Sequence, residues 1–408
     1  MKVFRMVILL GLLSTGQAQD SGSFIAALVE GKPSLDSRLR VENVADDAFE
    51  DNAHALTWRN RLGYRSAPWQ GLTFFGELED VRALDERYNS TANSRTRYPV
   101  IADPEGSELN QAGIAWDSGL SANASATQIT LGRQRVVLDN QRFFGNVGWR
   151  QNEQTFDALS ATQIVQTNTT LRYVYLDKVH RVFGQHHPNP LSAQFELNGH
   201  LLNLAHVFSV GTLTGYGYWI ENTDLPLSST QSIGARFSGV KVLSAPYKLL
   251  YSLEFAHQQD WRGGARNIGA DYHLIELGLA RGALTGKIAQ ELLGGNGRSA
   301  FQTPFATLHA FNGWDDKFLT TPLNGLVDRY ASLAGTVGTA QWLMAYHQFQ
   351  ADTTNALMPS KNYGREWDAS ISVPFKQRFS AIAKFARYDA NNFSSDNRKF
   401  WLSIEYRY

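Results

Sequence analysis

The chain has 408 residues, no cysteine, and 38 basic against 38 acidic residues. Without cysteine it has no disulfide, no thiol nucleophile and no thiolate metal site. Its balanced charge excludes the cationic footprint that nucleic-acid binding requires, so we expect no nucleic-acid partner.

The first eighteen residues predict a signal peptide. Lys2 and Arg5 precede the short apolar run Val7–Leu13, and small residues at Gly16 and Ala18 mark a cleavage site. Removing the two basic residues leaves a net charge of about −2 against the 38 acidic residues, with histidine neutral. The leader indicates export from the cytoplasm.

The rest of the chain predicts one domain. We expect residues 1–18 to be removed and residues 19–408 to form it, because no linker or low-complexity run divides them. Aromatic residues make up 12% and charged residues only 19%, which suits a sheet with one face in lipid. No later apolar run approaches the ~18 residues of a spanning helix. A membrane-spanning form therefore has to be a closed β-barrel.

The N-terminal part alternates apolar and basic residues with a period of two. Leu56, Trp58 and Leu62 fall on one face of a predicted strand, and Arg59 and Arg61 fall on the other. Like charges on one face need water or carboxylates nearby. The lumen of a barrel supplies that water, and the wet face of a soluble sandwich would also do so.

Two polar segments predict loops. Leu84–Ser107 is irregular and indicates a long extracellular loop. His180–Ser192 holds three histidines beside two prolines, which favour a loop over a metal site.

Between them, the segment Leu131–Ala158 (LGRQRVVLDNQRFFGNVGWRQNEQTFDA) is a long insertion rich in arginine and amide side chains. It lacks a helical repeat, and Gly145 and Gly148 would break one. We expect it to fold into or line the lumen of the barrel. A solvated surface loop is the alternative.

Alternation returns in the second half and ends on an aromatic residue. Phe400, Leu402 and Ile404 alternate with Trp401, Ser403 and Glu405 up to Tyr408. Such an end is similar to the sorting signal of bacterial outer-membrane barrels. The candidate strands number eighteen or nineteen, and because single-chain bacterial barrels have even numbers we predict eighteen. The fold class is thus an all-β, antiparallel up-and-down transmembrane barrel with its lumen partly filled by loops.

The insertion also carries a resemblance. LGRQR and the following DNQRFFGNVGWRQNEQTFDA resemble the signature segment of the alginate export family of outer-membrane barrels, and so do Tyr173–Gly184 and Tyr247–Gln258. The resemblance implies a monomeric barrel that passes anionic polysaccharide through an arginine-lined lumen. It leaves open whether the substrate is alginate and whether periplasmic secretion partners exist.

A set of charged residues is the candidate substrate pathway, because arginine pairs with carboxylates through two parallel hydrogen bonds. The alternative is an ordered network that only stiffens the barrel. The predicted basic lining is Arg59, Arg61, Arg133, Arg135, Arg142, Arg150 and Arg172, with Asp139, Glu153 and Asp157 as counter-charges.

These observations predict an outer-membrane channel for anionic solutes, surrounded by outer-membrane lipids and without a metal or cofactor. Polysaccharides such as uronates are the first reading, and small organic acids or sugars are the second. A non-conducting structural or adhesive barrel is a further alternative. No G-x-S-x-G motif is present, so we expect no enzyme.

Overall fold

The computed structural model describes residues 22–119, 125–356 and 359–408. The predicted signal peptide lies outside these residues. Within the described chain, eighteen antiparallel strands form one sheet. The strands are β1 (Lys32–Asp46), β2 (Ala53–Arg65), β3 (Leu72–Arg87), β4 (Gly106–Asp117), β5 (Ala126–Gln134), β6 (Thr155–Val165), β7 (Thr169–His180), β8 (Gln194–Phe208), β9 (Gly211–Asn222), β10 (Thr230–Ser244), β11 (Tyr247–Asp260), β12 (Gly269–Arg281), β13 (Leu284–Leu293), β14 (Leu326–Val337), β15 (Ala340–Gln350), β16 (Asn362–Phe375), β17 (Phe379–Ala390) and β18 (Asn397–Arg407).

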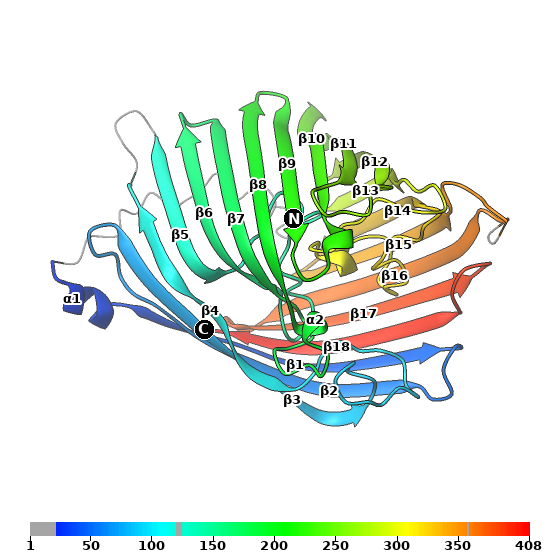
Figure 1. The fold of residues 1–408 in the computed structure, drawn as a ribbon, viewed down its shortest axis with the longest axis horizontal. Helices are drawn as coiled ribbons and strands as arrows, with labels where there is room; N and C mark the ends of the chain where they lie inside the picture. Colours follow the sequence, from blue (N-terminus) through cyan, green and yellow to red (C-terminus); the bar gives the residue numbers. More distant parts are fainter. Residues whose placement is uncertain (1–21, 120–124, 357–358) are drawn as a thin grey trace.

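The sheet closes on itself. Each strand pairs with its neighbours in sequence, and β1 pairs with β18 from Asp36↔Arg407 to Asp46↔Asn397 (Figure 1). The eighteen-stranded, up-and-down barrel predicted from the sequence is confirmed. In the part of the chain that the structure covers, no helix is long and apolar enough to cross a membrane.

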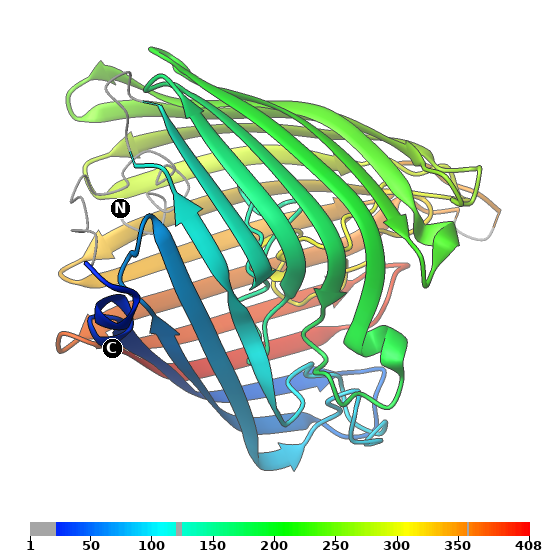
Figure 2. The same cartoon turned by 60° about the vertical axis from the view of Figure 1, so that its left-hand side comes forward.

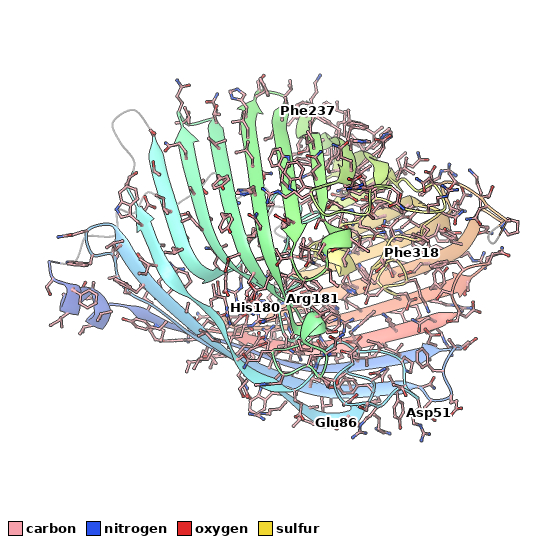
Figure 3. The ribbon with its side chains drawn as sticks, viewed as in Figure 1. Asp51, Glu86, His180, Arg181, Phe237 and Phe318 are labelled. Carbon is pink, nitrogen blue, oxygen red and sulfur yellow. The ribbon has the colours of Figure 1, made fainter. Side chains whose placement is uncertain are left out.

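The two faces of the wall differ as the alternation predicted. On β18, Phe400 and Leu402 point outward and are exposed, whereas Trp401 and Ser403 are buried on the inner side. Figure 3 shows side chains on both faces of the wall. An apolar outer belt of this kind fits the hydrocarbon of a bilayer. The barrel, and not a soluble sandwich, accounts for the period of two.

The two ends of the barrel are unequal. At the end that holds the chain termini the connections are short, as with the two residues Gly282 and Ala283 between β12 and β13. Outer-membrane barrels have short periplasmic turns, so this end is the periplasmic one. The opposite end carries long connections, including residues 135–154 and 294–325. The loop predicted at Leu84–Ser107 is shorter than expected, because β3 stays paired with β2 as far as Arg87.

Two of the long connections turn back into the barrel, where the views in Figures 1 and 2 show them inside the wall. We call them the 135–154 loop and the 294–325 loop. They meet through Phe144 and Phe305, whose rings stack with centroids 5.6 Å apart. Phe143 and Phe301 join the same buried cluster. The insertion is therefore inside the lumen, and the solvated surface-loop interpretation is wrong.

Candidate functional site

The 135–154 loop is held against the inner wall by arginines of β1 and β2. The Arg38 guanidinium donates to the carbonyl oxygens of Gly148 at 3.2 Å and Trp149 at 3.0 Å. Arg40 donates to the Trp149 carbonyl at 2.7 Å and lies 4.0 Å over its ring, and Arg61 donates to the Gln151 carbonyl at 3.1 Å. Strand alternation places these side chains inward. They bind loop backbone and stay buried.

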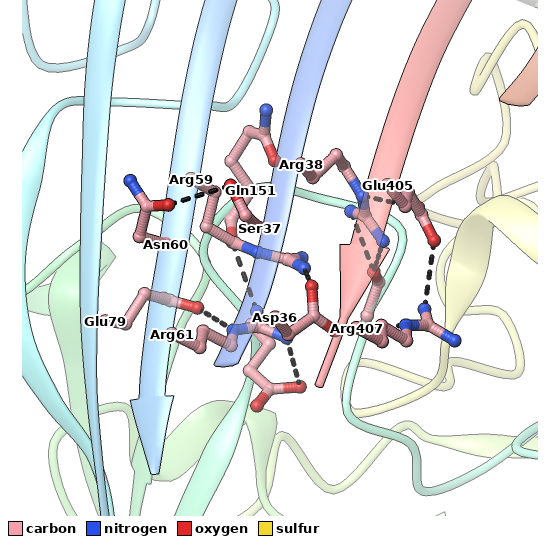
Figure 4. Close-up of polar contacts among 12 residues, drawn as sticks. Asp36, Ser37, Arg38, Arg59, Asn60, Arg61, Glu79, Gln151, Glu405 and Arg407 are labelled. Atoms are coloured by element: carbon pink, nitrogen blue, oxygen red, sulfur yellow. Dashed lines mark hydrogen bonds and ion pairs between the residues drawn. The ribbon is translucent and has the colours of Figure 1, made fainter. Parts of the chain in front are cut away.

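Carboxylates from several elements offset these cations (Figure 4). Arg38 pairs with Glu405 at 2.7 Å, and Arg59 pairs with Asp36. Arg61 lies between Glu79 and Glu153, the predicted counter-charge. Arg59 is 0% exposed, so it makes no contact with a solute in this arrangement.

The loop contributes two buried arginines of its own, Arg142 and Arg150. Arg142 donates to the Glu291 carboxylate on β13 at 2.7 Å and to Asn312 of the 294–325 loop at 3.0 Å. Arg150 pairs with Glu42 at 3.1 Å. Burial lowers the pKa of both arginines, but the neighbouring carboxylates raise each pKa above its ordinary value. These residues tie the two inner loops to the wall.

A second group of charges lies where the tip of the 135–154 loop faces β7 and β10. Arg172 donates to the Val137 carbonyl at 3.0 Å. Arg236 lies 3.8 Å from Asp139 and 3.6 Å from Glu254. Burial raises the pKa of Asp139, although Arg236 and Arg172 oppose that rise. Both arginines keep part of their surface exposed, unlike Arg59 and Arg142.

Arg135 belongs with the partly exposed group. It follows the end of β5 and donates to Glu77 and Glu153, each at 2.5 Å. Its side chain is 31% exposed, whereas the Glu153 side chain is fully buried. Burial raises the pKa of Glu153, but Arg61 and Arg135 hold it below the ordinary value.

The pairing register puts Arg133 and Asp157 on the outer face, which corrects their predicted place in the lumen. Arg133 on β5 lies opposite Asp157 on β6, and two residues further along the same strands Leu131 lies opposite Leu159. Both leucines are exposed on the outer face. Asp157 also contacts His180 at 2.9 Å, which lies beside α2 (Pro190–Ala193) in Figure 3. Side chains two apart on a strand share a face. The alternation does not extend to Arg135, because β5 ends at Gln134 and Arg135 belongs to the inner loop.

Sequence reasoning also missed Arg38, Arg40 and Arg236 as members of the site. The first two had a visible signal, since they alternate with Leu39 and Val41. Arg236 had none, because its partner Asp139 lies on a loop far away in sequence. Among the residues the structure places, no group of three His, Cys, Asp or Glu side chains is arranged to hold a metal.

No family model matches the sequence, and no curated protein matches it. Solved structures do match the fold. Acinetobacter baumannii OccAB4 is 12% identical, with 96% of this chain and 99% of that chain covered and a TM-score of 0.70. Pseudomonas aeruginosa OpdK, solved with vanillate, is 15% identical, with 93% and 99% covered and a TM-score of 0.68. The fold is that of an outer-membrane porin.

The predicted location in the outer membrane is confirmed by this fold, a closed eighteen-stranded barrel whose backbone groups are all paired within the sheet. The resemblance to the alginate export family is wrong. The similar structures are Occ and Opd proteins, not an alginate exporter, and no family model supports the match. An arginine-rich, amide-rich segment is what an inner loop needs in order to pack against a charged wall, so its composition does not identify a substrate.

Proposed function

We propose that this protein is a monomeric channel that lets small anionic organic solutes, such as carboxylates, cross the outer membrane. The observation that carries the proposal is the group of partly exposed arginines, Arg135, Arg172 and Arg236, around the inner loops. Fixed cations along a pore favour anions. Arginine also recognises a planar carboxylate through two parallel hydrogen bonds.

The inner loops favour a small solute over a polymer. The 135–154 and 294–325 loops contact one another through a buried aromatic cluster, with Gly145 donating its backbone N–H to the Phe305 carbonyl at 2.9 Å. An eighteen-stranded wall alone would leave a wide channel. Packed loops across it reduce the free cross-section.

The carboxylates beside the arginines suit conduction, because a solute has to leave each contact as readily as it enters. Asp139 and Glu254 sit within 4 Å of Arg236 and weaken its hold on an anion. Vanillate, with which OpdK was solved, is a small aromatic carboxylate and so belongs to the class of solute proposed here. The buried arginines that position the loops are Arg38, Arg40, Arg61, Arg142 and Arg150.

The test is the reversal potential across a planar bilayer in a salt gradient. We expect anion selectivity in the wild type and a marked loss of it in a variant carrying Arg172→Gln and Arg236→Gln. Arg329→Gln is the matched control, because Arg329 lies exposed on the outer face, with Gln290 and Gln350 as its partners. An unchanged anion preference in the double variant would refute the assignment of these arginines. No conductance at all would favour the structural-barrel interpretation.

A further inference from the structure

A short helix lies outside the barrel at its periplasmic edge. α1 (Phe24–Val29) lies at the end of the barrel near the C-terminus (Figure 2) and contacts Tyr64 of β2 and Phe74 of β3 on the outer face of the wall. Its Ala27 carbonyl accepts the Ala67 backbone N–H at 3.0 Å, and its Leu28 carbonyl accepts the Tyr64 hydroxyl. The Phe24 ring stands edge-on to Phe74, with centroids 5.6 Å apart. The helix is fixed to the wall.

The helix presents its large apolar side chains away from the protein. Ile25 is 72% exposed and Val29 is 79% exposed, and Leu28 is exposed beside them. These positions share one side of a helix, since residues four apart face the same way. The side that meets the barrel carries Ala27, which is 1% exposed. A helix whose outer side faced water would expose polar residues and bury its large apolar ones, and α1 shows the opposite arrangement.

The surroundings of this apolar face are lipid-facing. Leu62 on β2 and Leu78 on β3 are exposed on the outer side of the wall, on the same faces as Tyr64 and Phe74, which contact the helix. The helix therefore continues the apolar belt at its periplasmic edge. Exposed apolar surface that adjoins a membrane-facing surface is stabilised by the same lipid.

We propose that α1 is an interfacial anchor whose Ile25, Leu28 and Val29 side chains insert into the periplasmic leaflet of the outer membrane. The helix lies at the boundary between headgroups and acyl chains, with polar Ser23 and Glu30 at its two ends. The anchoring is independent of what the channel conducts. A lipid leaflet is favoured over a second copy of the chain because the helix is seated on Tyr64 and Phe74, which share the outer face of the wall with the exposed Leu62 and Leu78.

The absence of cysteine allows a direct test on the full chain. Single variants Ile25→Cys and Val29→Cys are spin-labelled in phospholipid vesicles, and collision with oxygen is compared with collision with a water-soluble nickel chelate. Ile288→Cys provides the lipid reference, since it is 63% exposed on the outer face of β13. Ala283→Cys, in the exposed turn after β12, provides the water reference.

We expect the oxygen-to-nickel ratio at positions 25 and 29 to lie close to that of Ile288→Cys and several-fold above that of Ala283→Cys. A ratio equal to the turn reference would overturn the proposal. Spin–spin broadening that grows with the protein-to-lipid ratio would also overturn it, since a second copy would then cover the face. Heat-dependent gel mobility checks that each labelled barrel is folded. We expect all of them to fold, because the exposed positions carry no structural contact across the wall.

Discussion

Replacing Arg142 with glutamine should release the 135–154 loop without unfolding the barrel. Arg142 is buried to 1% exposure, and besides the bonds to Glu291 and Asn312 it lies 4.7 Å over the Phe311 ring. Removing one partner of a buried ion pair costs about 3–5 kcal/mol. Glu291 keeps a hydrogen bond from Tyr272 at 2.7 Å and one from Asn312 at 2.6 Å, so we expect the lower end of that range.

A loss of about 3 kcal/mol raises the population of the displaced loop roughly 100-fold, since about 1.4 kcal/mol corresponds to a factor of ten. Single-channel recording should then show larger current fluctuations and a higher mean conductance than in the wild type. Arg133→Gln, which removes an arginine on the outer face, is the control and should leave the current unchanged. Identical traces for Arg142→Gln and wild type, with unchanged amide exchange in residues 140–150, would refute the view that this pair holds the loop.

Three further predictions concern the same architecture. Burial, reinforced by Lys384, lowers the pKa of His309 to about 3, while burial raises the pKa of Asp315 to about 7. On going from pH 7 to pH 5, His309 therefore disfavours the seated 294–325 loop, because the displaced loop binds the proton, whereas Asp315 favours the seated loop, because the seated loop binds the proton. Asp315→Asn should therefore make current fluctuations increase at pH 5, where those of the wild type change little. Phe144→Ala removes a ring stacked on Phe305 and should cost about 3–5 kcal/mol, seen as faster proteolysis of the inner loops, and an unaltered cleavage rate would contradict it. Leu402→Arg places a cation on the lipid face of β18 and should lower the free energy of barrel folding by about 2–4 kcal/mol in a urea titration, an effect that the exposed-turn substitution Ala283→Arg should lack.

The wall was predictable because its signal is local. The alternation around Trp401 and around Arg59 indicates which side chains face lipid. The sheet must then close into a barrel, because an open sheet would leave backbone hydrogen-bonding groups of its edge strands unpaired in the membrane. The composition of the insertion predicted that it lies in the lumen but left a solvated surface loop open as the alternative, and only the contact between Phe144 and Phe305 decides between them.

The partners inside the lumen were not predictable. Arg142 and Glu291 are 149 residues apart, and nothing in either neighbourhood indicates the other. Arg133 and Arg135 look equivalent in the sequence, yet one is within the ladder and the other is just beyond it. Where a strand ends decides which side of the wall such a residue occupies, and strand ends depend on pairing with distant segments.

The ion pair between Arg38 and Glu405 has a consequence for biogenesis. The two residues are 367 positions apart and belong to the first and last strands, so they meet only when the cylinder is sealed. The Arg38 guanidinium also donates hydrogen bonds to the carbonyl oxygens of Gly148 and Trp149. The 135–154 loop thus acquires all of its hydrogen bonds to the wall only after β1 has paired with β18. Through Arg38 the loop in turn stabilises the pairing of these two strands from the lumenal side.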